Sequence, residues 1–252
     1  MMITENPLNT YADAFELYKQ TTQEKQNIAS IIKTYVNVLP EHKVLDVGSA
    51  QGTVVKMIQP NLENITMVDV IDQDVSPCTY IQKPFEKIDT NTLRNKYDLV
   101  IASHVWGHFY HNGSAKESLI KMCDATKDNG YLVIVSNTNS GFFGDLGKFV
   151  KRTLPESQIN QFHEFRKTSE NRCFIYFDDY RRSLSNCGCV YFNTYVKMNS
   201  MEQLTDLCRI FFVNDDEEYT KKRDIIHHYL KKRLPFPELC IEQKAYILQV
   251  QK

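Results

Sequence analysis

The segment from Val44 to Gly52, which reads VLDVGSAQG, constrains the fold of this chain more than any other part of the sequence. The mostly apolar run Val44–Val47 predicts a strand that leads into a turn with Gly48 and Gly52, and a helical pattern follows. Glycine suits such a turn where the backbone must approach a ligand or where a helix must lie close to a sheet. The helix that we expect to begin near Gly52 also presents backbone N–H groups to an anion. The segment therefore predicts a strand, a glycine turn and a helix that together seat a nucleotide cofactor.

The spacing of the glycines separates two kinds of cofactor site. The pattern is D-x-G-x-x-x-G and lacks the G-x-G-x-x-G spacing expected for a dinucleotide pyrophosphate. It resembles the first motif of class I S-adenosylmethionine-dependent methyltransferases, D/E-x-G-x-G-x-G, with Ala50 where a glycine is common. The resemblance implies that S-adenosyl-L-methionine is the cofactor and that Asp46 lies near its methionine end. It also implies cofactor contacts from Gly48, Ser49 and Gly52.

Later strands provide further candidates for the cofactor site. Ile65–Asp69 is a short apolar strand that ends in a carboxylate about 20 residues after the glycines, the position from which an acid binds ribose hydroxyls. We therefore expect Asp69 to bind the ribose. Residues 79–86 predict a third strand and a loop, where the resemblance implies contacts to adenine; Phe85 is the candidate for stacking, with loop packing as the alternative. Ser103, which follows the predicted fourth strand, is a further candidate for cofactor binding.

Strand and helix patterns alternate in the order that builds a mostly parallel sheet. The near-continuous apolar character of the central strands implies burial on both faces. We predict an α/β fold, a seven-stranded, mostly parallel, Rossmann-like sheet flanked by helices, with N-terminal helices in residues 11–39 and a helical cap over the active site. The resemblance implies an antiparallel last strand at the edge of the sheet. Besides the third strand, we expect strands at residues 44–47, 65–69, 97–102, 131–136, 190–198 and 245–250 and a helix from 178 to 187 that ends at Gly188.

Length and pattern predict one methyltransferase domain over residues 1–252. We divide it into an N-terminal helical cap (1–40), a cofactor-binding half (41–136) and a substrate-side half (137–252). Within the last part, residues 137–170 are expected to form a lid, and residues 142–153 show the helical pattern that would cover the pocket.

Composition narrows the range of partners. The formal net charge of −1 gives no overall attraction to nucleic acid or to an anionic membrane. No apolar run approaches the roughly 18 residues of a membrane span. Seven cysteines, an odd number with irregular spacing, suit reduced thiols. We therefore expect a cytoplasmic protein with a small-molecule substrate and neither a nucleic-acid nor a membrane partner, while the oligomeric state stays open.

The loop Ser103–His111 gathers histidines and aromatic residues where open α/β sheets bind ligands. His104 and His108 are four residues apart, a spacing that would place them on one face of a helix. His104 is a catalytic candidate because an imidazole titrates near neutral pH and could accept a proton from a nucleophile. His108 is a second candidate, and a structural role is the alternative for both. No metal is expected, because the H-E-x-x-H pattern is absent.

Three stretches resemble the histamine N-methyltransferase type of small-molecule methyltransferase, and they are residues 14–26, 132–143 and 178–212 with the acidic turn that follows. The resemblance implies that a glutamate of the N-terminal helices and a side chain after the fourth strand hold the substrate. These positions are Glu24 and His104 here. A polar residue at the start of the last strand, near Glu242 or Gln243, would also contribute. A histidine replaces the amide of that branch, so the substrate stays open, and the aromatic candidates for substrate binding are Tyr18, Trp106 and Phe142.

These features predict an S-adenosylmethionine-dependent methyltransferase of the EC 2.1.1 class that methylates a small molecule, at an amine or imidazole nitrogen. O-methylation of a small metabolite and methylation of an RNA base are alternatives. An NAD-dependent dehydrogenase would need the missing middle glycine. The non-enzymatic alternative is a module that binds the cofactor without catalysing transfer.

Overall fold

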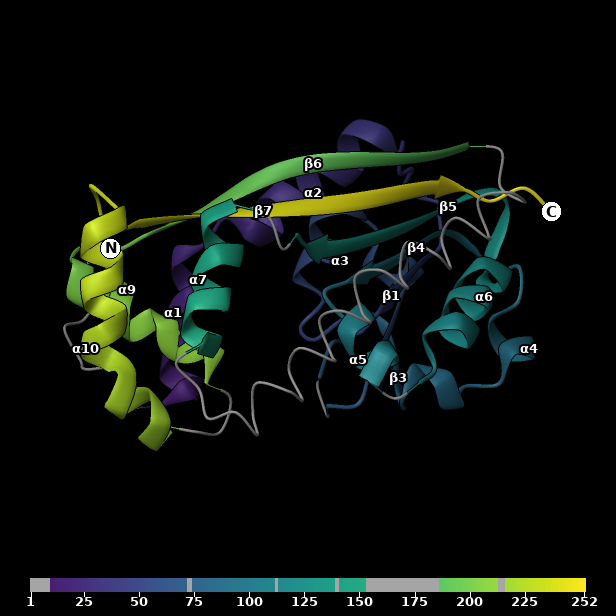
Figure 1. Cartoon of the computed structure of the whole chain (residues 1–252). Helices are drawn as coiled ribbons and strands as arrows, with labels where there is room; N and C mark the ends of the chain where they lie inside the picture. Colours follow the sequence, from purple (N-terminus) through teal and green to yellow (C-terminus); the bar gives the residue numbers. More distant parts are fainter. Residues whose placement is uncertain (1–9, 72–73, 112, 139–140, 153–185, 213–215) are drawn as a thin grey trace. The chain divides into compact units, whose positions relative to one another are not determined.

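The computed structural model describes the chain at residues 10–71, 74–111, 113–138, 141–152, 186–212 and 216–252 (Figure 1). The chain divides into two compact units. The helical unit comprises residues 1–24, 138–161 and 193–242, and the sheet unit comprises residues 25–137, 162–192 and 243–252. Within the described residues, none of the helices has the length and apolar character needed to cross a membrane.

Seven strands form one sheet in the order β3-β2-β1-β4-β5-β7-β6. The strands from β3 to β5 pair in parallel, whereas β7 pairs antiparallel with β5. The predicted α/β class and the mostly parallel, seven-stranded sheet are therefore confirmed. The strands are β1 (Val44–Val47), β2 (Ile65–Asp69), β3 (Thr79–Gln82), β4 (Tyr97–Ser103), β5 (Thr126–Asn137), β6 (Asn186–Lys197) and β7 (Glu238–Gln249).

Two expectations about the last strands are wrong. Strand β7 lies between β5 and β6, so β6 and not β7 is the edge strand. The buried run Gln243–Leu248 fits this interior position. The prediction of a helix from 178 to 187 is also wrong at its carboxyl end, because Asn186 and Cys187 belong to β6. Residues 178–185 lie outside the described part. Gly188 lies inside the strand, where pairing with a segment distant in sequence overrides a local pattern that resembled a helix end.

Helices cover both faces of the sheet unit (Figure 1). Alternation along β1 sends Leu45 and Val47 to one core cluster and Val44 to the other. The helices that contribute to the first cluster are η2 (Phe85–Lys87), α4 (Thr90–Leu93), α5 (Trp106–His111) and α6 (Ala115–Ala125). Those that contribute to or pack against the second are α2 (Glu24–Tyr35), α3 (Thr53–Ile58) and η1 (Leu62–Asn64). The carboxyl ends of β1, β2 and β4 thus belong to a sheet that is packed on both sides.

Within the described residues, the helical unit has a separate apolar core to which four α-helices and one short 3₁₀ helix contribute. They are α1 (Tyr11–Thr21), α7 (Gly141–Arg152), α9 (Met201–Leu207) and α10 (Asp216–Arg233), and the short helix η3 (Cys208–Phe211) follows α9. The N-cap residue of α1 is Thr10, whose side chain forms a reciprocal capping box with Asp13. α9 begins at Ser200, whose hydroxyl accepts from the Gln203 N–H. The N-terminal helices expected in residues 11–39 are present as α1 and α2.

Helix α7 coincides with the helix expected at residues 142–153. Its Leu146 and Val150 are buried in the core of the helical unit, and the Phe149 ring stacks on Tyr229 with 3.9 Å between centroids. α7 is therefore a packed element of this unit. Its role as a lid stays a prediction, and residues 153–170 of the expected lid lie outside the described part.

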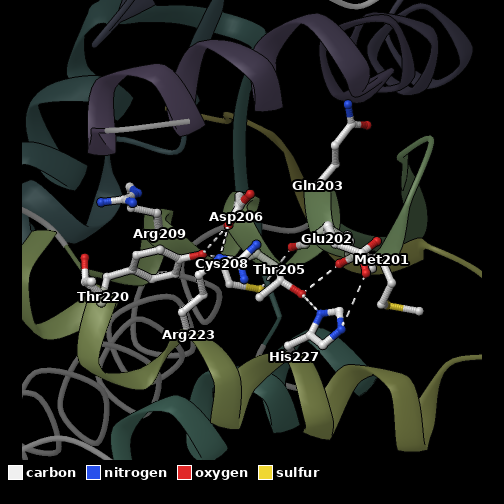
Figure 2. Close-up of polar contacts among 12 residues, drawn as sticks. Met201, Glu202, Gln203, Thr205, Asp206, Cys208, Arg209, Thr220, Arg223 and His227 are labelled. Atoms are coloured by element: carbon white, nitrogen blue, oxygen red, sulfur yellow. Dashed lines mark hydrogen bonds and ion pairs between the residues drawn. The ribbon is translucent and has the colours of Figure 1, made fainter. Parts of the chain in front are cut away.

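A group of polar side chains joins α9 to α10; we call Thr205, Asp206, Tyr219, Arg223 and His227 the α9–α10 polar cluster (Figure 2). The Oδ1 atom of Asp206 accepts hydrogen bonds from the Tyr219 hydroxyl at 2.9 Å and from Arg223 Nε at 2.6 Å. The Thr205 hydroxyl lies 2.8 Å from His227 Nδ1. Burial, followed by the charge of Asp206, raises the pKa of Tyr219. The cluster thus satisfies polar groups with partners from the chain itself.

Candidate cofactor and active site

The turn after β1 is built by backbone hydrogen bonds and by close packing. Gly48 and Gly52 adopt φ values of 68° and 66°, in the left-handed region that favours glycine. A Cβ atom on Gly48 would lie 2.5 Å from the Val105 side chain, and one on Gly52 would lie 2.6 Å from the Met67 side chain. The sequence offers two reasons for glycine in this turn, the approach of a ligand and close packing of the chain. The structure shows close packing at both glycines. The N–H groups of Gly48 and Ser49 both donate to the Val68 carbonyl, which holds the turn against the end of β2.

Asp69 is fixed at the carboxyl end of β2. Its Oδ2 accepts a hydrogen bond from the Ala50 N–H at 2.7 Å, and its Oδ1 accepts from the N–H groups of Val70 at 2.7 Å and Ile71 at 3.2 Å. These contacts tie the carboxylate to the glycine turn of the neighbouring strand. A carboxylate has about four lone-pair sites, so capacity is left for further donors.

Asp46 lies in β1 and is buried, with only 4% of its surface exposed. Its carboxylate makes no hydrogen bond with any residue that the structure describes. The pKa of this carboxyl is raised to about 7: burial raises it, the positive charge of Lys25 opposes this effect, and the negative charge of Asp69 adds to it. A buried acid without hydrogen-bond donors is unfavourable in the folded chain and would be stabilised by a cationic ligand.

The loop after β3 is anchored by Lys121 from α6, a residue that the sequence analysis did not identify. Its ammonium group donates to the carbonyl oxygens of Phe85 at 3.2 Å, Glu86 at 2.8 Å and Ile88 at 2.6 Å. Burial lowers the pKa of Lys121, and the charges of Glu86 and Asp89 oppose this effect. The three bonds satisfy a buried cation and fix the backbone of the loop.

Two further cofactor candidates differ in their surroundings. The hydroxyl oxygen of Ser103 is buried and lacks a hydrogen-bond partner among the described residues, so it offers a polar group to a ligand. The Phe85 ring has 4% of its surface exposed and packs at 5.9 Å from the Phe109 ring, between centroids. The chain itself covers Phe85, and this environment favours the loop-packing alternative over stacking on adenine.

His104 follows β4 and is held by residues from two other strands. Its N–H donates to the Val135 carbonyl at 2.9 Å, and its backbone has φ of 59°. The side-chain nitrogen of Gln243 in β7 lies 3.2 Å from His104 Nε2 and donates to Asn137 Oδ1 in β5 at 3.0 Å. Asn137 and Gln243 are register partners across β5 and β7. The antiparallel strand thereby brings Gln243, which is fully buried, to the carboxyl end of β4. Asn137 is a second residue that the sequence analysis missed, although its place at the end of a parallel strand could have indicated it.

His104 and His108 do not share a helical face, because α5 begins only at Trp106. His108 is exposed on that helix. Trp106 is buried with 4% exposed and meets Phe109 edge-on, so its surroundings are those of a core residue. No group of three or more His, Cys, Asp or Glu side chains suited to a metal is found among the described residues.

The other candidates lie in the helical unit. The Tyr18 hydroxyl donates to Glu24 Oε1 at 2.8 Å, and Glu24 has 6% of its surface exposed. Burial, followed by the charge of Glu24, raises the pKa of Tyr18. These two residues therefore form a pair, as a shared role would require. Phe142 belongs to α7, and its side chain lies outside the described part.

Residues 19–193 match the family model of the methyltransferase domain. The chain belongs to this methyltransferase family. No curated protein matches the chain. Solved structures share the fold: a possible methyltransferase from Bacillus halodurans has a TM-score of 0.56 at 13% identity, over 90% of this chain and 100% of the other. A possible histamine N-methyltransferase from Thermotoga maritima has a TM-score of 0.52 at 10% identity, over 96% and 94%. A plantazolicin methyltransferase solved with S-adenosylhomocysteine has a TM-score of 0.52 at 11% identity, over 94% and 90%.

The methyltransferase is thus an enzyme of the EC 2.1.1 class whose cofactor is S-adenosylmethionine. The residues present fit this cofactor. A buried acid without donors, Asp46, suits a cationic ligand, and the buried Ser103 hydroxyl suits a polar one. Both belong to neighbouring parallel strands, since β1 pairs with β4.

Proposed function

We propose that this methyltransferase transfers a methyl group to a nitrogen atom of a small molecule, an amine or an imidazole. The observation that supports the proposal is the placement of His104 at the carboxyl end of β4, where Gln243 contacts its ring. Ligands of open α/β sheets bind at this edge, and an imidazole there can exchange hydrogen bonds with a nitrogen nucleophile. The resemblance of three stretches to the histamine N-methyltransferase type supports nitrogen over oxygen as the acceptor.

The cofactor would be held by the turn after β1 and by the two acids. Asp46 would face the positive charges at the methionine end, and Asp69 would accept hydrogen bonds from the ribose hydroxyls. Ser103 would donate to a polar group of the cofactor. Gly48, Ser49 and Gly52 would shape the turn against which it rests. Lys121 would keep the loop after β3 in place where the adenine is expected.

When bound, S-adenosylmethionine supplies an electrophilic methyl group on a sulfonium. The chain's own residues then have to align the acceptor and exclude water, and such alignment can supply roughly 7 to 11 kcal/mol at the limit. The acceptor nitrogen attacks with its lone pair, so it must be uncharged. His104 would hydrogen-bond to a group of the substrate other than the attacking lone pair.

Cofactor binding is tested by calorimetric titration with S-adenosylhomocysteine. Asp69→Asn keeps one acceptor oxygen but loses the charge, so we expect affinity to fall on the order of 10- to 100-fold. Asp74→Ala is the matched control, because this exposed acid follows the same strand and accepts only from the Ser76 N–H in the described chain. Unchanged affinity in Asp69→Asn would contradict the ribose assignment.

The acceptor is tested by incubating the enzyme and S-adenosylmethionine with panels of amines, imidazoles, alcohols and short RNAs, and by mass analysis of the products. We expect a mass increase of one methyl group on nitrogen compounds. Methylation confined to alcohols or to RNA would overturn the proposal in favour of the corresponding alternative.

A further inference from the structure

The contacts around Gln243 limit where the proton on His104 can be. The Gln243 side-chain nitrogen lies between two groups, Asn137 Oδ1 at 3.0 Å and His104 Nε2 at 3.2 Å. A primary amide nitrogen carries two hydrogens and has no lone pair available to accept a hydrogen bond. It therefore donates to both neighbours. An imidazole nitrogen that accepts a hydrogen bond carries no proton, so the proton of neutral His104 must be on Nδ1.

We infer that Gln243 is a positioning residue that keeps His104 as a neutral imidazole with its proton on Nδ1, and that Asn137 sets the direction of the Gln243 amide. Asn137 can do so because its Oδ1 is a hydrogen-bond acceptor, and only the nitrogen end of the Gln243 amide can donate to it. An imidazolium would place Nε2–H against the amide N–H, and the complete burial of Gln243 makes such a clash of donors costly.

The backbone at His104 is consistent with a ring held in a set orientation. A φ of 59° is rare for a residue other than glycine and costs about 1 kcal/mol or more. The Val135 carbonyl, which accepts the His104 N–H, keeps the backbone in this conformation. Three neighbouring strands, β4, β5 and β7, thus determine the position of one imidazole.

This inference rests on the proposed function for its consequence. With the Nε2 lone pair engaged by Gln243 and the proton on Nδ1, His104 has no lone pair left with which to remove a proton from the acceptor nitrogen. The acceptor nitrogen must then reach the site already uncharged. This differs from the role as a proton acceptor that the sequence alone indicates for His104.

The test is a nitrogen-detected NMR spectrum of the histidine side chains in the full-length protein, with His104→Asn used to assign the His104 signals. At about pH 7 we expect the pattern of an imidazole protonated at Nδ1. A spectrum that shows the His104 proton on Nε2, or protons on both ring nitrogens, would overturn the inference. The three side chains would then have flipped orientations or different hydrogen-bond partners.

Gln243→Glu provides a second test, because it replaces a donor by a carboxylate that accepts. The proton of His104 should move to Nε2, and the pKa of the ring should rise by more than about one unit. Gln249→Glu is the matched control on the same strand and should leave the His104 signals unchanged. If Gln243→Glu does not fold, the wild-type spectrum decides alone. Absence of transfer to any nitrogen acceptor would overturn the proposed function and leave the NMR result intact.

Discussion

Two carboxylates, one in each unit, show opposite ways of placing an acid in a folded chain. Asp206 in the helical unit accepts hydrogen bonds from Tyr219 and from Arg223. Asp46 in the sheet unit is buried more deeply, and no described residue donates a hydrogen bond to it. The pKa of Asp46 is raised to about 7, mainly by burial.

The difference separates an acid that supports the fold from one that we propose binds the cofactor. A buried polar group is normally paired, because removing it from water without a partner costs free energy. Asp206 follows this rule. Asp46 breaks it, and residues that break a local rule tend to occur at functional sites. We therefore expect changes at Asp206 to lower stability and changes at Asp46 to raise it while weakening cofactor binding.

The largest effect is expected for Asp206→Ala. The change leaves the Tyr219 hydroxyl and the Arg223 guanidinium without their shared acceptor, so the free energy of unfolding should fall by about 3 kcal/mol. Chemical denaturation measures this change. Asp224→Ala is the control, since Asp224 is an exposed acid on α10, next to Arg223 in sequence, and should change stability by less than about 0.5 kcal/mol. Equal losses in the two variants would remove the contrast between Asp206 and Asp46.

Local patterns predict the parallel half of the sheet well. β1 and β2 have the predicted bounds, because each is a short apolar run limited by a turn. The identity of the edge strand could not be predicted from the sequence, since the positions of β6 and β7 depend on pairing between segments far apart along the chain. Gly188 illustrates this limit, because only the pairing of β6 with β7 distinguishes a glycine in a strand from one that ends a helix.

Residues at strand ends could be predicted as candidates, but their partners could not. The sequence indicates Asp69 and His104 because each follows an apolar run. It does not indicate that Lys121 reaches three carbonyls of a loop or that Asn137 meets Gln243, since those contacts depend on strand and helix packing. The Val105 side chain against Gly48 likewise explains a glycine that the motif attributes equally to ligand approach.

The next effect in size is expected for Asp46→Asn in the cofactor-free protein. The raised pKa means that the folded state keeps its proton between about pH 4 and pH 7 while the unfolded chain has lost it. The contribution of Asp46 to stability is thus fully present below about pH 4 and is lost as the pH rises through about 7. The asparagine variant avoids this loss, and at about pH 8 it should be more stable than the wild type by on the order of 2 kcal/mol.

Thermal or chemical unfolding across this pH range measures the difference, and calorimetry with S-adenosylmethionine should show weaker binding by the variant. Asp98→Asn is a control of opposite sign. Lys127 and the Lys43 N–H hold the pKa of Asp98 below its usual value despite partial burial. Its contribution is present above about pH 4 and is lost as the pH falls, so Asp98→Asn should destabilise at neutral pH. A pH-independent effect of Asp46→Asn would show that Asp46 is ionised in the folded state throughout.

The smallest effect is expected for Ala50→Gly, which tests the turn that lies beside both acids. Ala50 has φ of 45°, a left-handed conformation that is strained for alanine, and its N–H donates to Asp69. Glycine relieves this strain but makes the unfolded chain more flexible, so the free energy of unfolding should rise by less than about 1 kcal/mol. Asn129→Gly is the control, since asparagine tolerates its φ of 61° better than alanine tolerates a positive φ, and it should gain less.

Removing the Ala50 methyl group also widens the turn, and calorimetry with S-adenosylmethionine should show affinity that is unchanged or higher. A loss of affinity in Ala50→Gly would mean that the strained alanine holds Asp69 in its binding position, and the turn would then belong with Asp46 among the features maintained for the ligand.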